Sequence, residues 1–171
     1  MSVVGCRFVS QPTKGSALKT KKTPNRSFHV LDVENELSGG NFGASDVARL
    51  RRVWNIVVEP ADQDLYFLAT GTRTASAIAF GWPSATKEVR AGKDGADDAI
   101  IDHLDVAYVS ARFDHVYLGT GDHRMQPKAQ ALLDAGVKVT IVGHKHSIHW
   151  SYYTVKGIEF KYLDEQWALA A

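Results

Sequence analysis

From residue 27 onward, short apolar runs alternate with segments in which apolar residues recur at helical spacing. A short apolar run bounded by turn residues is typical of a buried strand, whereas spacing of three and four residues indicates one face of a helix. The runs predict strands at 28–33, 65–70, 86–90, 116–119, 137–143 and 157–163. The helical spacings predict helices at 45–54, 72–80, 96–109 and 129–135, and the segment 164–171 is too short to assign.

This alternation of strands and helices predicts the class of fold. Parallel strands need long crossover connections, and helical crossovers cover both faces of the sheet with right-handed connections. We therefore expect a three-layer α/β/α domain of Rossmann-like type over residues 27–171, with a mostly parallel central sheet. The strand at 157–163 is the candidate for an edge position, and Ser45 is the expected N-cap of the first helix.

Composition favours one ordinary globular domain. The 171 residues are 44% hydrophobic, which supports a buried core, and no apolar run approaches the length needed to cross a bilayer. Cys6 is the single cysteine, so an internal disulfide is excluded, and the first residues lack the charged and apolar regions of a secretory signal. These features predict a cytoplasmic protein without a membrane partner.

Charge is unevenly distributed along the chain. Residues 1–26 contain six basic side chains and no acid, so residues 27–171 hold the other 14 basic residues and all 19 acidic ones. Ser, Thr, Pro and Gly are frequent from residue 10 to 25, which predicts a flexible basic tail that attracts phosphates without sequence preference. The alternative is an ordinary disordered terminus that only aids solubility.

Carboxylates follow or flank the apolar runs. Asp32 ends the first run, Asp97 and Asp98 begin a helical segment, and Asp122 follows the strand at 116–119. Open parallel sheets bind ligands beyond the carboxyl ends of their strands. If these strands are neighbours, the acids converge at one edge, where only a bound cation makes such crowding favourable. Oxygen ligands select a hard cation such as Mg²⁺ or Mn²⁺, and such a site suits phosphodiester cleavage.

Each acid also has a purely structural interpretation. Asp32 fits a strand-end cap, and Asp122 fits a turn or helix cap, because Asp is common in loops. The shared order and register of these positions favours the metal site over isolated caps. At the start of the central helix, both Asp97 and Asp98 satisfy the pattern, and we select Asp97 as the expected ligand.

Three segments resemble the motifs of NYN domains, a family within the PIN-like nuclease superfamily. His29-Val-Leu-Asp-Val-Glu-Asn35 is similar to their opening strand, in which an apolar strand ends in Asp followed closely by Asn. The segment 93–102, with Lys, Gly and Asp before an apolar helix, is similar to their central segment. The segment 116–122 is similar to their strand ending in Thr-Gly-Asp or Ser-Gly-Asp, and the resemblance covers about residues 27–163.

The resemblance implies a PIN-like domain with an acidic pocket that binds Mg²⁺ or Mn²⁺ and cleaves RNA. Matched position by position, Asp32, Asp97 and Asp122 correspond to the metal-binding acids. Asn35 corresponds to the polar residue that positions ligand or substrate. The expected activity is that of a metal-dependent ribonuclease, an endonuclease acting on single-stranded or loop RNA.

One position departs from the NYN pattern. Many members carry a second Asp two residues after the Gly-Asp pair, where this chain has Arg124, next to His123. Arg124 and His123 are therefore candidate contacts to a phosphate of the substrate. The missing acid also leaves a rival interpretation open, namely a noncatalytic nucleic-acid-binding or regulatory module that keeps the fold with a degenerate site.

Basic residues near the expected sheet edge are candidates for binding the nucleic-acid backbone. Lys93 precedes the central acids together with Lys87 and Arg90, and these residues either guide RNA toward the pocket or form a solvated charged face. Lys145 belongs to the segment 144–153, whose aromatic residues either line a groove for phosphates and bases or contribute to the core. The same aromatic residues also fit the face of a homodimer.

Other chemistries find less support in the sequence. His144, His146 and His149 suggest zinc, but paired cysteines and a closed set of four ligands are missing. The glycine-rich segment 39–43 lacks the Gly-Lys-Ser/Thr that completes a phosphate-binding loop, and we expect it to be a flexible loop near the site. Neither a Gly-x-Ser-x-Gly elbow nor an Asp-x-Asp phosphatase motif is present.

Overall fold

The structure is a computed structural model that describes residues 25–39 and 41–170. The basic tail expected at 1–26 therefore falls, apart from its last two residues, outside the described residues. Within the described ranges, none of the helices is long and apolar enough to cross a membrane. The expected domain at 27–171 corresponds to one central sheet and the helices packed on it, as described below.

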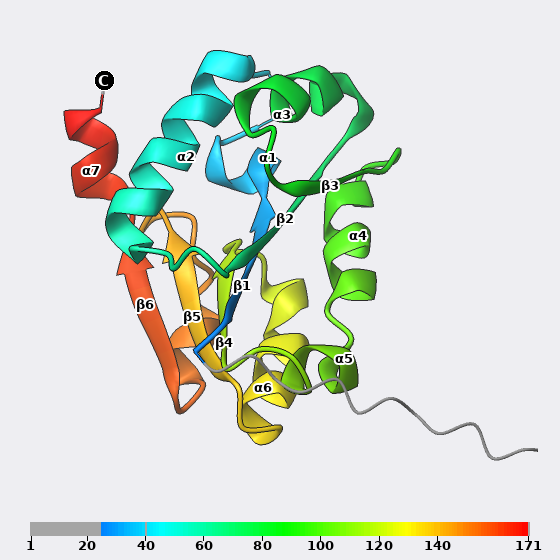
Figure 1. Cartoon of the computed structure of the whole chain (residues 1–171), viewed down its shortest axis with the longest axis vertical. Helices are drawn as coiled ribbons and strands as arrows, with labels where there is room; N and C mark the ends of the chain where they lie inside the picture. Colours follow the sequence, from blue (N-terminus) through cyan, green and yellow to red (C-terminus); the bar gives the residue numbers. More distant parts are fainter. Residues whose placement is uncertain (1–24, 40, 171) are drawn as a thin grey trace, which may run out of the picture.

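A six-stranded sheet forms the centre of the molecule (Figure 1). Its strands are β1 (Ser27–Asp32), β2 (Leu65–Thr70), β3 (Thr86–Val89), β4 (His115–Gly119), β5 (Lys138–Gly143) and β6 (Ile158–Tyr162). They lie in the order β3-β2-β1-β4-β5-β6, and every neighbouring pair is parallel. This arrangement confirms the expected α/β fold class, and β6 occupies an edge of the sheet, as predicted.

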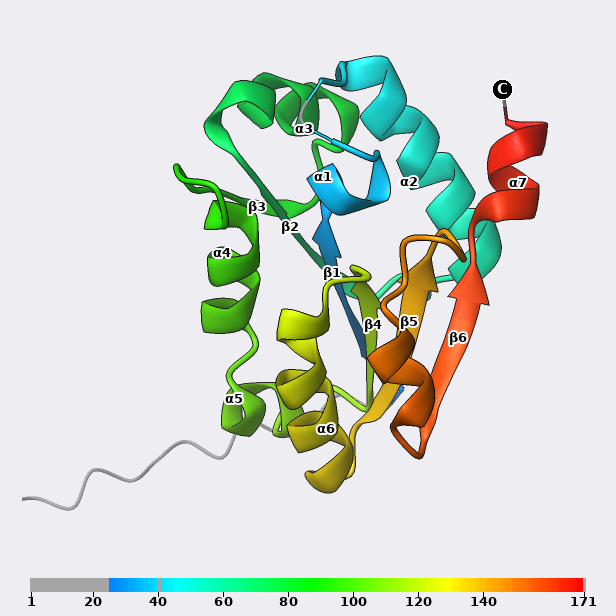
Figure 2. The same cartoon turned by 180° about the vertical axis from the view of Figure 1, so that it is seen from behind.

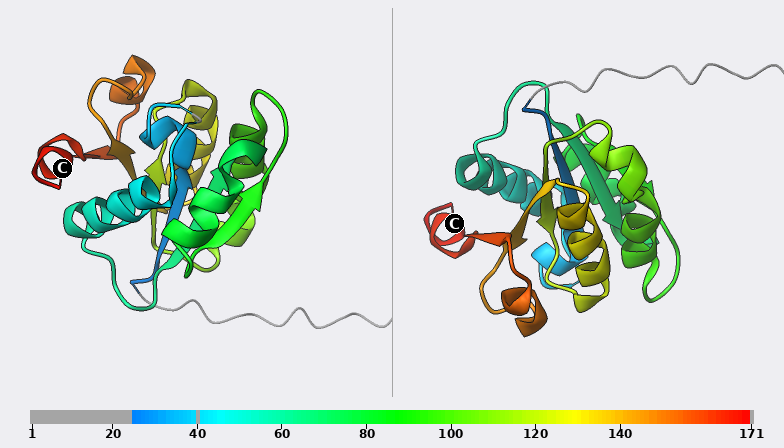
Figure 3. Two further views of the ribbon diagram at one scale, coloured as in Figure 1. Left: turned by 90° about the horizontal axis from the view of Figure 1, so that it is seen from above. Right: turned by 90° about the horizontal axis from the view of Figure 1, so that it is seen from below.

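Helices cover both faces of the sheet (Figures 2 and 3). The α-helices are α1 (Val33–Glu36), α2 (Ala44–Val58), α3 (Ala75–Gly81), α4 (Gly95–His103), α5 (Val106–Ser110), α6 (Gln126–Asp134) and α7 (Asp164–Leu169). Short 3₁₀ helices are η1 (Thr72–Thr74), η2 (His123–Met125) and η3 (Trp150–Thr154). One apolar cluster contains side chains from α4, α5 and α6, and the other contains side chains from α2 and α3 with Trp167 of α7 packed against it. The three layers are therefore helices, sheet and helices.

The central strand β1 is buried along its whole length because both of its faces are covered. Phe28 and Val30 belong to the cluster of α4, α5 and α6, whereas Leu31 belongs to the cluster on the other face with Trp54. Side chains alternate between the two faces of a strand. Asp32 therefore follows Phe28 and Val30 toward the face that carries α4.

Two helix predictions need correction. The expected helix at 96–109 is two helices, α4 and α5, because Asp105 accepts a hydrogen bond from Tyr108 N and starts a new helix there. Tyr108, expected on the buried face, is 47% exposed. The first long helix begins at Ala44 rather than after Ser45, because Gly43 is the N-cap and donates its backbone N–H to Asp46 Oδ2 (2.8 Å).

Candidate functional site

The order in which successive strands are added to the sheet changes direction at β1 and β4, so a topological switch point lies between these two strands. From β1 the chain moves outward through β2 to β3, then returns to β4 on the other side of β1 and continues to β5 and β6. Such a switch point leaves a crevice at the carboxyl ends of the two central strands, where open α/β sheets bind ligands. Asp32 ends β1 at this crevice, and residues 120–122 follow β4 there.

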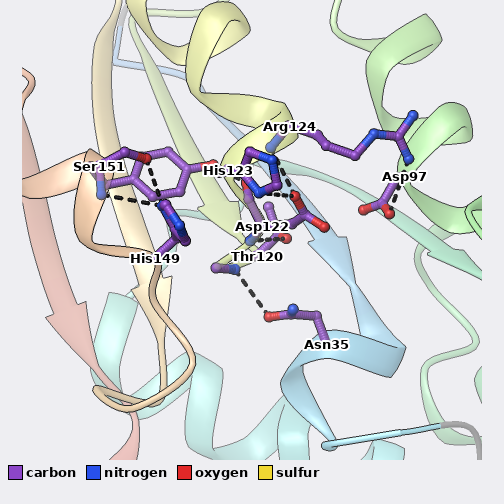
Figure 4. A network of polar contacts seen from close by, with 10 residues as sticks. Asn35, Asp97, Thr120, Asp122, His123, Arg124, His149 and Ser151 are labelled. Carbon is purple, nitrogen blue, oxygen red and sulfur yellow. Dashed lines mark hydrogen bonds and ion pairs between the residues drawn. The ribbon is translucent and has the colours of Figure 1, made fainter.

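Asn35 connects the two sides of the crevice. Its Oδ1 accepts a hydrogen bond from Gly121 N across 3.0 Å, and Figure 4 shows this contact between α1 and the loop after β4. Asp32 holds α1 in place, because its Oδ1 accepts the backbone N–H groups of Glu34 (3.0 Å) and Asn35 (3.1 Å). Asp32 Oδ2 makes no hydrogen bond to the described residues and stays available to a ligand.

Asp122 is held by the loop that carries it. Its Oδ1 accepts the N–H of Arg124 (2.8 Å), which makes Asp122 the N-cap of η2. Its backbone N donates to Thr120 Oγ1 (3.1 Å), and its carbonyl oxygen accepts the hydroxyl of the buried Tyr152 (2.6 Å). His123 Nδ1 lies 3.3 Å from Asp122 Oδ1, with an exposed ring. Asp122 is therefore a helix cap, as its structural interpretation predicts, and it also lies at the crevice.

Of the two acids in the first turn of α4, Asp97 faces the crevice. Its side chain is 14% exposed, and its Oδ1 is buried without a hydrogen-bond partner among the described residues. The Asp98 side chain is 50% exposed and binds Arg124 Nη2 at 2.7 Å. Arg124 Nη1 also lies 3.4 Å from Asp97 Oδ2 (Figure 4), so the guanidinium pairs with both acids in the structure.

The carboxylates of the crevice affect one another's titration. Burial raises the pKa of Asp32 to about 7, against the lowering effect of the Asn35 N–H, and the charge of Asp97 raises it further. Burial also raises the pKa of Asp97, as does the charge of Asp122, while Arg124 opposes the shift. Asp97 therefore lies near enough to both Asp32 and Asp122 for their charges to affect one another.

A fourth carboxylate lies beside them. Glu36 of α1 is fully buried, and neither of its carboxylate oxygens has a hydrogen-bond partner in the described part of the chain. Burial raises the pKa of Glu36 well above its usual range, and the charges of Asp32 and Asp164 add to this effect. The side chain packs against Gly143 at the end of β5, where an added Cβ would lie 3.1 Å from Glu36 Oε1.

The chemistry of these donors fits a hard divalent cation. Mg²⁺ and Mn²⁺ prefer oxygen ligands, and the crevice offers carboxylate oxygens of Asp32 and Asp97 that lack hydrogen bonds to the described residues. A bound cation would also favour the charged forms of both carboxyl groups, whose pKa values are raised mainly by burial and further by neighbouring acids. Among the described residues, no three or more His, Cys, Asp or Glu side chains stand close enough together to hold a metal ion, so Asp32, Asp97 and Asp122 line the crevice without converging on one point.

The predicted basic contacts lie in different places. Lys93 lines a cavity next to α1, whereas Lys145 follows β5, and its backbone N donates to Asp164 Oδ2 (3.0 Å) beside α7. Lys87 donates to two backbone carbonyl oxygens, and Arg90 binds Glu88 and Asp102. Lys87 and Arg90 therefore stabilise the surface around β3.

The segment after β5 divides between core and surface. His144 is buried and its Nδ1 lies 3.4 Å from Asp164 Oδ1, while Tyr152 is fully buried. Trp150 is 69% exposed and Tyr153 is also exposed. In the described residues, the histidines of this segment form no group of three metal ligands.

Sequence reasoning missed the residues that support the predicted acids. Thr120 and Tyr152 hold the Asp122 loop, and Glu36 lies one helical turn after Asp32. The spacing of Asp32 and Glu36 would place them together only if the four-residue helix α1 had been predicted. Comparison of the chain with protein-family models, with curated proteins and with solved structures found no match.

Proposed function

We propose that this protein is a metal-dependent ribonuclease that hydrolyses phosphodiester bonds of single-stranded or structured RNA. The observation that carries the proposal is the position of Asp32, Asp97 and Asp122 around the switch point of a parallel sheet, where burial and, to a lesser extent, neighbouring negative charge raise the pKa values of Asp32 and Asp97. The resemblance of the segments around these acids to NYN domains supports RNA as the substrate and cleavage within the strand. A cytoplasmic location, as the sequence predicts, suits this substrate.

Each residue has a specific task in the proposed reaction. Asp32, Asp97 and Asp122 would hold Mg²⁺ or Mn²⁺, which supplies an acidified water and stabilises charge on the leaving oxygen. Asn35 fixes α1 against the loop after β4 and so sets the spacing between Asp32 and Asp122. His123, whose ring is exposed beside Asp122, is placed to contact a phosphate of the substrate. Arg124 is placed to do the same once it leaves Asp98.

One observation favours a second candidate function. Arg124 occupies the position where many NYN members have an acid, and its guanidinium binds Asp97 and Asp98. A fixed cation at this place reduces the need for a metal ion. The second candidate is therefore a noncatalytic module that binds nucleic acid without cleaving it.

Cleavage of an end-labelled single-stranded RNA in Mn²⁺, in Mg²⁺ and in EDTA tests the proposal. Asp122→Asn keeps an oxygen that can accept the N–H of Arg124, so the loop is retained while a charged ligand is lost. Asp62→Asn makes the same chemical change at an exposed position and serves as the matched control. A DNA strand of the same sequence shows whether the 2′-hydroxyl matters.

The two candidates predict different results. A ribonuclease gives metal-dependent products with the wild-type protein and with Asp62→Asn, and none with Asp122→Asn. The noncatalytic module gives equal trace products with all three proteins and still binds the strand. In that case the assignment of Asp122 as a catalytic ligand is wrong.

A further inference from the structure

A cavity of about 400 Å³ lies at the carboxyl edge of the sheet, next to the acidic crevice. Loops after β2 and β3 and the start of α1 form its walls. Its lining consists of Glu34, Gly71, Thr72, Arg73, Gly92 and Lys93. None of these residues is aromatic or a large apolar residue, so the cavity provides no surface on which a base would stack.

Two cations of this cavity have no internal partner. Arg73 and Lys93 are exposed, and neither forms a hydrogen bond or an ion pair with any residue in 25–39 or 41–170. Arg90 and Arg124, the other arginines at this end of the sheet, are already held by carboxylates. Arg73 and Lys93 therefore keep their full capacity to bind an anion from solution.

Glu34 connects this cavity to the metal site. Its backbone N donates to Asp32 Oδ1, and its side-chain Oε1 accepts the hydroxyl of Thr74 (3.2 Å). The carboxylate packs so closely on Gly71 that an added Cβ there would lie 2.9 Å from Oε1. Glu34 thus forms the wall between Asp32 and the cavity, and its single negative charge is outnumbered by the two cations.

The side of the cavity formed by Lys93 adjoins the start of α4, which carries Asp97. Lys93 lies two residues before α4, whose first turn carries Asp97. A strand that passes Asp32 and Asp97 toward β3 would therefore also pass Arg73 and Lys93.

We propose that Arg73 and Lys93 form a subsite for a backbone phosphate of the RNA strand, next to the phosphodiester bond at the metal site. This inference rests on the proposed function. The subsite recognises the charge of the phosphate and does not distinguish between bases, because its lining offers two cationic side chains and no stacking surface. It fixes the strand along the edge of the sheet in the direction from β1 toward β3.

Binding measurements with matched charge controls test the subsite. The affinity of a fluorescent single-stranded RNA is measured in Mg²⁺ over a range of salt concentrations, with Asp122→Asn as the non-cleaving background. The test variant adds Arg73→Gln and Lys93→Gln. The control adds Arg52→Gln and Lys156→Gln, which remove the same charges from exposed positions outside the cavity.

We expect the test variant to bind RNA roughly tenfold more weakly for each lost contact, and its salt dependence to fall by about 0.7 in slope for each contact. The control variant keeps the affinity and slope of the background protein. In the cleaving protein, Arg73→Gln and Lys93→Gln raise KM and leave kcat within about twofold.

RNA strands with one uncharged backbone linkage show which phosphate occupies the subsite. Methylphosphonate replaces one phosphate at a time along the strand, and the background protein loses affinity where the replaced phosphate occupied the subsite. If Arg73 and Lys93 bind that phosphate, the test variant should bind the strand with the neutral linkage as tightly as it binds the unmodified strand. Equal sensitivity of both proteins at every linkage overturns the subsite.

Failure of the subsite and failure of the proposed function give different results. If the wild-type protein cleaves RNA and the test and control variants bind it equally, the subsite is wrong and the nuclease stands. If no metal supports cleavage and only the test variant binds weakly, the nuclease is wrong and the phosphate subsite stands. If the background protein binds no RNA at low salt, both are wrong.

Discussion

Asn35 Oδ1 accepts the backbone N–H of Gly121 across 3.0 Å, although 86 positions separate the two residues in the chain. This single hydrogen bond joins α1, which continues β1, to the loop that continues β4. Asp32 and Asp122 lie on the two segments so joined. Together with the pairing of β1 and β4, the bond therefore helps to set how far apart the two predicted metal ligands stand, and a carboxamide at position 35 has a structural role in addition to any contact with substrate.

Replacing Asn35 with Ala should destabilise the fold by about 1 to 3 kcal/mol, because Gly121 N would lose its partner in a half-buried place. Asn35→Asp retains an oxygen in the same position but adds a negative charge to the acidic crevice, so it should recover this loss only at a pH low enough to protonate the new carboxyl group. Urea unfolding of the two variants measures the difference. Equal stability of Asn35→Ala and wild type would show that the bond to Gly121 contributes nothing.

Gly121 has a second constraint, because an added Cβ would lie 2.0 Å from the carbonyl oxygen of Ser147. The backbone of the loop after β5 would have to move, since a carbonyl oxygen cannot rotate away as a side chain would. Gly121→Ala should therefore cost about 3 kcal/mol. At Gly43 the nearest atom to an added Cβ is 3.8 Å away, so Gly43→Ala, which loses only the preference for Gly over Ala at an N-cap, is the control and should cost about 1 kcal/mol or less.

Most of the fold could be predicted from the sequence, because each strand and crossover helix buries its own apolar pattern. The exceptions have local causes. Apolar residues continue at helical spacing from Ile100 through Leu104 to Tyr108, so the pattern conceals the break that Asp105 causes by capping α5. The helix α1 has only four residues, which is too short for any periodicity.

The site was predictable only in part. Acids after strands indicated Asp32 and Asp122, because parallel strands bring their carboxyl ends to one edge. The choice between Asp97 and Asp98 depends on how α4 is rotated against the sheet, which spacing alone does not define. Contacts between distant segments, such as Arg124 with Asp98, are invisible in the sequence. The cavity at Arg73 is likewise a product of packing.

Asp32→Asn should make the metal-free protein more stable at neutral and alkaline pH. Burial raises the pKa of Asp32 to about 7 in the folded state, so the fold favours the neutral carboxyl group. The wild-type protein therefore loses stability as the pH rises from about 4 to 7, whereas the amide does not titrate. A shift of this size corresponds to at most about 4 kcal/mol above pH 7.

Thermal unfolding in EDTA from pH 4 to 8 measures this effect. The two proteins should have similar stability near pH 4 and diverge as the pH rises. Asp62→Asn, at an exposed position, should follow wild type throughout. Added Mg²⁺ should reduce the gap at pH 8, because the cation stabilises only the protein that keeps the Asp32 carboxylate. Parallel curves for Asp32→Asn and wild type would contradict the assignment of a raised pKa.

Arg124→Gln should strengthen the binding of Mg²⁺ or Mn²⁺. The Arg124 guanidinium binds Asp98 at 2.7 Å and lies 3.4 Å from Asp97, so a metal ion at these acids competes with a cation that the chain itself supplies. The ion pair is partly exposed and such pairs are weak, so we expect the metal affinity to rise only a few-fold. Titration calorimetry of wild type, Arg124→Gln and the control Arg52→Gln measures the change.

The same variant separates the two candidate functions. If Arg124 also contacts a substrate phosphate, Arg124→Gln should bind the metal more tightly and yet raise KM for RNA. If Arg124 instead replaces the metal in a noncatalytic module, the wild-type protein should bind no Mg²⁺ in the millimolar range, and Arg124→Asp should create a measurable affinity. If Arg124→Gln binds the metal as tightly as wild type does, the Arg124 guanidinium does not compete with the metal ion for Asp97 and Asp98.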